Sequence, residues 1–322
     1  MFSYPVTSND LQDLPYPSNS DVEIFVGAHN EDIFSLDPVT SPWKVWSKPK
    51  FSTMTYMLAI GGGAAGGVGH DRPNGDPGGG GGGGGSSGMS SLLIPSFFLP
   101  DILYVSVGKG GIGGISGIGQ GSPGGISYIA YSPDGSVLLQ SNAVSADIGA
   151  DGDGSTPGAG GTAATISTQT LGSTLGIFRS IAGQAGVAGG SATGGNGVSV
   201  TAWSTIPLSG GAGGAGSDND PFSGGGITAA AATNFTYINW PTTAGAVAAG
   251  GGSGAPRRGG AGVNLWKPFL TSGGGGGGTN DTNGGDGNNG GIGSGGGGGG
   301  TGEAGTRRSG NGGPGMVMII SW

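Results

Sequence analysis

Few side chains in this sequence have the types and spacing that catalysis requires. The chain has two histidines, His29 and His70, and no cysteine, which excludes disulfides and thiolate metal sites. Matches to Gly-x-Gly-x-x-Gly are frequent, but this glycine density produces them by chance, and no helix follows to hold a pyrophosphate. Gly108-Lys109 continues with Gly110 where a phosphate-binding loop needs Ser or Thr. We therefore predict that the protein is not an enzyme and holds no cofactor.

Two aspartate–glycine segments come closest to a metal site. Asp147, Asp151 and Asp153 alternate with glycines, as in a loose calcium loop, but the closing Glu of an EF-hand is missing. Residues 284–290 resemble a single copy of a glycine–aspartate calcium repeat. For both segments, turn formation is a stronger interpretation than calcium binding. We therefore predict no metal site.

Composition sets the class of protein. Glycine supplies 83 of 322 residues, roughly a quarter against an average near 7%. Only 9% of residues are charged and 34% are hydrophobic, whereas disordered chains combine low hydrophobicity with high charge. The net charge is −8, and Lys and Arg are scattered apart from the pairs at 257–258 and 307–308. This pattern favours an ordered chain and excludes an electrostatic footprint for nucleic acid.

The longest glycine tracts lie at residues 78–85, 273–278 and 295–300. Flexible linkers are one interpretation, and collagen is excluded because the glycines are not phased at every third position with abundant proline. The favoured interpretation is an extended helix of the polyproline II type, with three residues per turn and outward N–H and C=O groups. Fixing glycine backbone is costly in entropy, so only a bundle of tracts bonded to one another is expected to be stable.

Short β-prone runs frame these tracts. Residues 1–42 are predicted to be an N-terminal attachment arm containing a strand at Asp21–Val26, and residues 43–322 a single glycine-rich module. Further strands are expected at Met54–Ile60, at 103–107, 126–131 and 136–140, and at the C-terminus, 316–322. The first and last of the module's strands could pair and close it. We predict a mostly β and irregular fold, with little or no α-helix around a glycine bundle.

The one long apolar stretch, residues 92–107, contains Pro95, Pro100 and Asp101, so we expect no membrane insertion. The first eight residues lack the pattern of a secretory signal, which suits a protein packaged into a particle inside a host cell.

Four segments between the tracts, 70–76, 217–222, 233–240 and 263–269, contain polar turn formers, and the last three also contain Phe, Tyr or Trp. Exposed loops on a rigid scaffold are the usual place for binding residues, and aromatic residues dominate contact energies. The candidate contact residues are His70, Asp71, Arg72, Asp218, Phe222, Phe235, Tyr237, Trp240 and Trp266. The alternative, that the aromatic residues plug the bundle ends as a small core together with Trp203, stays open and is the stronger one for any single aromatic.

Three motifs carry a resemblance to a known group. They are the run from Trp46 to Phe51 that leads into the strand ending in Ile60-Gly-Gly-Gly, the Tyr104-Val-Ser-Val-Gly-Lys-Gly-Gly segment, and the closing Gly-Gly-Pro-Gly-Met-Val-Met-Ile-Ile-Ser-Trp322. Over residues 43–322 the chain resembles glycine-rich phage receptor-binding proteins, including the tail-fibre adhesins of T-even-like phages. The resemblance implies a sandwich of polyglycine II helices whose distal loops recognise a cell-surface protein or glycan. The group has no fixed contact motif, so it assigns no contact residues here.

Three functions follow as hypotheses. The leading one is a viral structural surface protein, a fibre tip or spike on the virion, that binds a host receptor through its loops and other virion or fibre proteins through its arm. The alternative is a self-assembling subunit of a filament or virion coat, a homo-oligomer in which glycine tracts pack between chains. A glycan depolymerase would need two carboxylates about 5–10 Å apart across a cleft, and is the weakest of the three.

Overall fold

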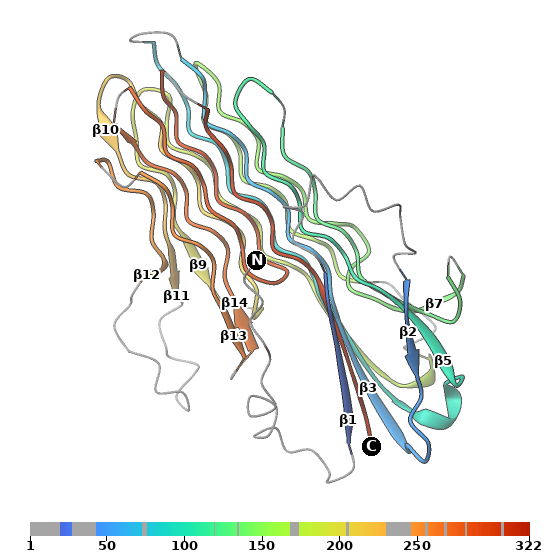
Figure 1. Cartoon of the computed structure of the whole chain (residues 1–322). Coiled ribbons are helices and arrows are strands. Elements are labelled where there is room, and N and C mark those ends of the chain that lie inside the picture. Colours follow the sequence, from blue (N-terminus) through green and yellow to red (C-terminus); the bar gives the residue numbers. More distant parts are fainter. Residues whose placement is uncertain are drawn as a thin grey trace.

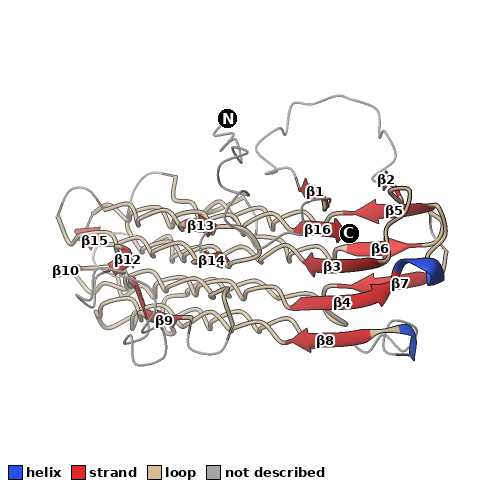
Figure 2. Cartoon of the chain, turned by 90° about the horizontal axis from the view of Figure 1, so that it is seen from below, coloured by secondary structure: helices blue, strands red, loops and turns tan. Residues whose placement is uncertain are grey.

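The computed structural model describes residues 20–27, 43–72, 76–118, 120–133, 135–167, 174–203, 206–229, 246–254, 257–266, 269–280, 282–303 and 306–322. Glycine-rich segments without regular strand structure run side by side along one long axis (Figure 1). They lead at one end into β-sheets and at the other into loops around β10 and β15, as Figure 2 shows. We call the sheet-bearing end the strand end and the loop-bearing end the tip.

The largest sheet lies at the strand end and joins both ends of the module. Its five strands run in the order β1-β16-β3-β4-β8, and each pairs antiparallel with its neighbour. Their bounds are β1 (Asp21–Val26), β16 (Met316–Ser321), β3 (Met54–Ile60), β4 (Met89–Pro95) and β8 (Ile177–Ile181). The predicted pairing of the first module strand with the C-terminal strand is confirmed, since β3 and β16 pair from Met316–Ile60 to Ser321–Thr55.

A second sheet of four strands packs against the first. It has the order β2-β5-β6-β7, all antiparallel. Its strands are β2 (Trp43–Ser47), β5 (Ile102–Ser106), β6 (Tyr128–Ala130) and β7 (Val137–Gln140). Strands alternate their side chains between two faces, and the inward residues of the two sheets form one buried cluster that includes Trp46, Met57, Leu92, Leu103, Ile129 and Ile319. This sandwich core anchors the glycine segments at the strand end.

The remaining strands are short. They are β9 (Val200–Ala202), β11 (Ile227–Ala229) and β12 (Ala246–Ala248) in one sheet, the hairpin β13 (Asn264–Trp266) and β14 (Phe269–Thr271), and the pair β10 (Pro221–Phe222) and β15 (Thr279–Asn280). Only β9 and β11 pair in parallel. Helical structure in the described residues is limited to the 3-10 helix η1 (Ser96–Phe98) and residues 174–175. The predicted mostly β and irregular fold with little helix is confirmed.

The predicted N-terminal arm contributes a strand to the module. β1, within residues 1–42, pairs along its full length with β16, and Phe25 is buried in the sandwich core. The part of the arm that the structure describes, residues 20–27, therefore belongs to the main sheet. Its use as an attachment segment stays a prediction.

Hydrogen bonds along the tract at residues 78–85 repeat every three residues. The N–H groups of Gly79, Gly82 and Gly85 all donate to the segment at 147–153. Those of Gly80 and Gly83 donate to the segment at 187–190, and those of Gly81 and Gly84 to the segment at 296–299. The N···O distances of these seven bonds run from 2.8 to 3.1 Å. The tract thus donates to three neighbours in turn.

The carbonyl groups of the same tract accept from three other segments. Gly67 N bonds Gly82 O at 2.7 Å, Gly161 N bonds Gly83 O at 2.8 Å, and Gly214 N bonds Gly81 O at 2.8 Å. Six segments of the same chain therefore surround the tract. A Cβ atom on Gly82 would lie 2.0 Å from Ala159 O, far inside van der Waals contact. Close packing of backbones explains why this tract contains only glycine.

Buried serines occupy the junction between strands and glycine segments. Ser127 Oγ donates to Ile60 O (2.6 Å) and accepts from Gly108 N (2.9 Å), while Ser127 N donates to Ser141 Oγ (3.1 Å). Ile60 ends β3 and Gly108 follows β5 shortly, so both sheets change here from strand pairing to the three-residue pattern. Hydroxyl groups satisfy backbone groups that neither pattern pairs.

We expect Ser127→Ala to lower the free energy of unfolding by about 1–3 kcal/mol, because it leaves the Ile60 carbonyl and the Gly108 N–H buried without a hydrogen-bond partner. Chemical denaturation followed by tryptophan fluorescence measures the change. Ser47→Ala is the matched control, since Ser47 is exposed on β2. Equal stability of the two variants would contradict this role of Ser127.

Candidate functional site

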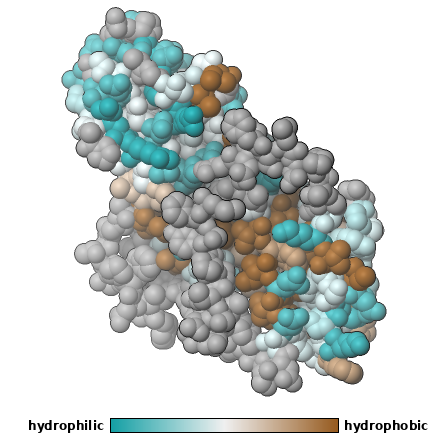
Figure 3. Space-filling model, viewed as in Figure 1, coloured by the Kyte–Doolittle hydropathy of each residue, from teal (hydrophilic) through white to brown (hydrophobic). Residues whose placement is uncertain are grey.

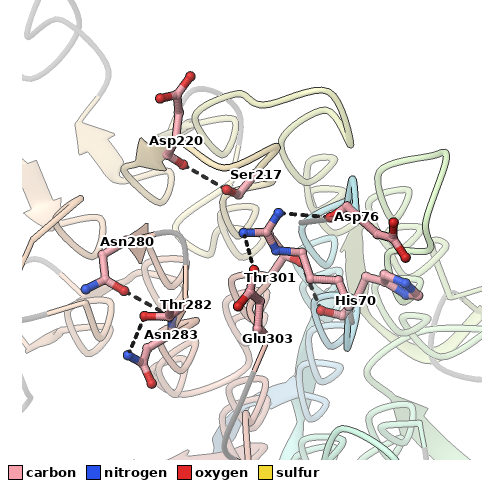
Figure 4. Close-up of polar contacts among 10 residues, drawn as sticks. His70, Asp76, Ser217, Asp220, Asn280, Thr282, Asn283, Thr301 and Glu303 are labelled. Carbon is pink, nitrogen blue, oxygen red and sulfur yellow. Dashed lines mark hydrogen bonds and ion pairs between the residues drawn. The ribbon is translucent and has the colours of Figure 1, made fainter. Parts of the chain in front are cut away.

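Loops that are far apart in the sequence meet at the tip. They comprise residues 70–72 and 76–78, 153–156, 191–195, 217–222, 279–284 and 301–303. Isolated bridges join Asp71 to Gly302 and Gly78 to Ser217. Hydrophilic residues gather over this end, whereas hydrophobic residues are concentrated towards the strand end (Figure 3). Figure 4 shows the polar side chains that converge there from several glycine segments.

Two buried arginines tie two of these loops together. Arg72 donates from Nη1 to Asp76 O (2.9 Å), and its Nη2 lies 3.6 Å from Glu303 Oε1. Arg307 donates from Nη2 to the Asp71 carboxylate. Each loop thus supplies an arginine to an acid of the other, and both arginine side chains are about 1% exposed. Asp71 itself stays solvated, with 59% of its side chain exposed.

Backbone contacts complete this connection. Arg72 N donates to Gly302 O (3.1 Å), and Thr301 Oγ1 donates to the carbonyl oxygen of His70 (2.9 Å). Figure 4 shows Thr301, His70 and Glu303 on neighbouring segments of the chain. Because both main-chain and side-chain bonds join the two loops, they form one rigid platform.

A second pair of loops lies beside the platform. Ser217 Oγ donates to Asp220 O (2.8 Å) inside its own turn, and β10 then pairs with β15 through Phe222 and Thr279. The Phe222 ring packs over Gly194, where a Cβ atom would lie 2.6 Å from the ring. Gly194 has φ +94, a conformation open to glycine at little cost. The aromatic ring therefore fastens two tip loops instead of standing free.

The turn at 280–283 is built from side-chain amides. Asn280 Oδ1 accepts from Asn283 N (3.0 Å), and Asn283 Nδ2 donates to Thr282 Oγ1 (3.0 Å). Thr282 O in turn accepts from Glu303 N (2.9 Å), which joins this turn to the platform. Thr282 and Asn283 are exposed, so amide and hydroxyl groups face solvent at the tip.

In the first aspartate–glycine segment, the side chain of Asp153 caps a turn. Asp153 Oδ1 accepts from the backbone N–H of Ser155 (2.7 Å) and of Thr156 (2.6 Å). These bonds, with the Thr156 and Ser155 hydroxyls, hold the pKa of Asp153 well below its usual range. Asp151 Oδ1 accepts from Val68 N (2.7 Å). Among the residues that the structure describes, no three His, Cys, Asp or Glu side chains gather as a metal-ligand set.

The structure brings five of the predicted contact residues to the tip: His70, Asp71, Arg72, Asp218 and Phe222. The expectation of an exposed Arg72 is wrong, because its guanidinium is buried in the ion pair with Glu303. Phe235, Tyr237 and Trp240 lie outside the described residues.

Trp266 does not lie at the tip. It pairs with Phe269 in the β13–β14 hairpin, with ring centroids 5.7 Å apart, and packs on the second core cluster of the main sheet around Ile60 and Leu208. Trp203 is also buried, and its indole N–H donates to Thr271 O (2.8 Å). For these two residues the core interpretation of the aromatics is the correct one.

Sequence reasoning missed Glu303, Arg307 and the turn at 280–283. The Arg307–Arg308 pair is visible in the sequence, but nothing local indicates that one arginine is buried and its neighbour exposed. The Asn280-Asp-Thr-Asn283 segment follows a six-glycine tract, which is the same context as the loops that were predicted. A polar segment close after a glycine tract was therefore the sequence signal that could have identified the turn at 280–283.

The tip offers carboxylate, amide and hydroxyl groups on a fixed backbone, a set suited to hydrogen bonding with a partner.

No helix among the described residues is both long and apolar enough to cross a membrane. Comparisons with protein-family models and with curated proteins found no match for this sequence.

Proposed function

We propose that the glycine tracts are polyglycine II helices. The support is the three-residue repeat of hydrogen bonds from residues 79–85 to three neighbours, with three further neighbours donating back. Three residues per turn is the periodicity of the polyproline II helix, whose backbone groups point outward. Packing of six segments around one tract also supplies the mutual bonding that offsets the entropy lost by glycine.

On this scaffold we propose a non-enzymatic attachment protein that recognises a host-cell surface receptor through its tip. The observation that carries the proposal is the separation of two ends. Loops from six parts of the sequence converge at the tip, while β1 and β16 lie together at the strand end (Figure 1). Such a molecule can be held by its strand end and present a rigid polar face at the other.

A place on the virion surface, as a fibre tip or spike, follows from the resemblance to glycine-rich phage adhesins. The partners on this proposal are virion or fibre proteins at the strand end and a receptor, protein or glycan, at the tip. No nucleic acid is expected, since the exposed carboxylates of Asp71, Asp76 and Asp220 at the tip repel phosphate.

Fluorescently labelled protein, tested against a panel of intact bacterial cells, examines the proposal. For a strain that binds, the triple variant Asp218→Ala, Asp220→Ala, Thr282→Ala is expected to lose binding at least about tenfold, the equivalent of one or two interface contacts. The control carries Lys44→Ala and Lys50→Ala, two exposed residues at the strand end, and should bind as the parent does. Equal loss in both variants, or binding that unlabelled protein does not displace, would reject recognition by the tip.

The alternative function, a self-assembling subunit of a filament or virion coat, predicts a different result. Glycine tracts packing between chains would give assemblies that grow with protein concentration, whereas the tract at 78–85 already has six neighbours within its own chain. Sedimentation velocity over a concentration series separates the two: continuous growth favours the filament, and one small species favours the attachment protein.

A further inference from the structure

Four Asn-Gly pairs occur among the described residues, at Asn196, Asn283, Asn289 and Asn311. In such a pair the backbone nitrogen of the glycine can attack the side-chain carbonyl carbon of the asparagine, because glycine has no Cβ atom to hinder the approach. Asparagine is thermolabile for this reason. The reaction needs a mobile side-chain amide and a glycine N–H that is not already bonded.

Three of the four pairs are held on both sides. At Asn196, Oδ1 accepts from Ser223 N (2.9 Å), and the following Gly197 N donates to Ser223 O (2.9 Å). At Asn311, Oδ1 accepts from Gly113 N (2.6 Å), and Gly312 N donates to Gly111 O (2.9 Å).

The third pair repeats this arrangement. Asn289 Oδ1 accepts from Asn311 N (2.9 Å), and Gly290 N donates to Asn311 O (2.9 Å). In each of the three, the attacking nitrogen and the attacked amide are both fixed in the hydrogen bonding of the glycine bundle. Reaction therefore requires local opening of that bundle first.

Asn283 differs in both respects. It is exposed in the turn at 280–283, and its side chain bonds only to the exposed Thr282 hydroxyl within the described residues. The bridge between Thr279 and Gly284 is made by two bonds, Gly285 N to Gly278 O and Asn280 N to Asn283 O. Gly284 N donates neither of them, nor any other hydrogen bond found among the described residues.

We propose that Asn283 is a site of spontaneous deamidation at the tip. Gly284 N, losing its proton to hydroxide, bonds to Cγ of Asn283, and the side-chain nitrogen takes a proton from water, which restores the hydroxide, and leaves as ammonia to give a five-membered succinimide. Water then opens the ring at one of its two carbonyls. Opening at the side-chain carbonyl gives aspartate, and opening at the main-chain carbonyl gives isoaspartate, which carries an additional methylene in the backbone. No oxidant or cofactor takes part.

The product changes the tip. Either opening places a new carboxylate beside Thr282, on the turn joined to Glu303 by its backbone, and isoaspartate also lengthens the turn. If the tip recognises a receptor, its binding face then changes with the age of the molecule while the glycine scaffold does not. This consequence rests on the proposed function.

Peptide mapping by mass spectrometry tests the modification itself, with no reference to binding. The native protein is incubated at mildly alkaline pH, and the deamidated fraction is followed at all four asparagines. Asn283 is expected to react at least about tenfold faster than Asn196, Asn289 and Asn311, whose reaction waits for opening of the bundle. In denaturant the four rates are expected to converge. Similar rates in the native protein, or a protected Asn283, would overturn the proposal.

Asn283→Gln is the matched variant, because ring closure through the longer side chain is slower and the turn keeps its backbone bond to Asn280 Oδ1. It should abolish reaction at position 283 and leave the other three sites unchanged. Gly284→Ala is unsuitable, since a Cβ atom there would lie 2.4 Å from Gly300 O. Deamidation that persists at the same rate in the peptide containing residues 280–284 of the glutamine variant would show that the assigned residue is wrong.

Discussion

Gly82→Ala is expected to prevent the chain from reaching its native fold. The added Cβ atom would lie 2.0 Å from Ala159 O and 2.6 Å from its carbonyl carbon. Overpacking of side chains typically costs about 1–3 kcal/mol, but here the obstacle is the backbone carbonyl of Ala159, which is held by a hydrogen bond from Ala150 N (2.8 Å). We therefore expect a loss above about 4–5 kcal/mol, the range in which single substitutions are exceptional. Thermal unfolding and amide exchange of residues 147–161 measure it.

Gly254→Ala is the control for this substitution. Nothing lies within 4 Å of the position its Cβ atom would take. Replacing a glycine at a compatible site reduces the freedom of the unfolded chain and stabilises by about 0.4–1 kcal/mol. The two substitutions are chemically identical and are expected to have opposite signs. A mild effect of Gly82→Ala would return the tract to the flexible-linker interpretation.

The strands that frame the module could be predicted because their pattern is local. Met54–Ile60 and Met316–Ser321 are β-prone runs that adjoin glycine, and they do pair. The sequence did not predict β4 (Met89–Pro95), although it lies inside the sheet between β3 and the edge strand β8. Its sequence begins Met-Ser-Ser and ends in proline, so its strand character comes from pairing with β3 rather than from its own propensity.

The tip was predictable only in part, for a related reason. Turn formers between glycine tracts mark loops, and Gly78, just beyond the first of these loops, does meet Ser217 in the loop at 217–222. Which tip residues stay exposed depends on partners more than 200 residues away: Arg72 meets Glu303, and Asp71 meets Arg307. Aromatic residues in these segments are a poor indicator of exposure, because Phe222 and Trp266 pack against their own chain.

Arg72→Met is expected to unfold the tip locally while leaving the sandwich core intact. Removing one partner of a buried ion pair costs about 3–5 kcal/mol, and Arg72 is about 1% exposed. The variant also loses the bond from Nη1 to Asp76 O. Arg307→Met is expected to cost less, because its partner Asp71 is 59% exposed and regains water on separation. Hydrogen exchange at residues 70–78 and 301–303 should rise in both variants, more steeply for Arg72→Met.

Arg308→Ala is the matched control, since Arg308 adjoins Arg307 in sequence but is exposed. It should change exchange at the tip little, as surface charges usually do. A double-mutant cycle between Arg72→Met and Glu303→Gln isolates the energy of the pair from lost packing. If the cycle shows no coupling, or if exchange rises equally at the strand end, the two arginines are not what holds the tip loops together. The glycine bundle alone would then determine the shape of the loops, and the polar face at the tip would tolerate substitution of every charged residue in it.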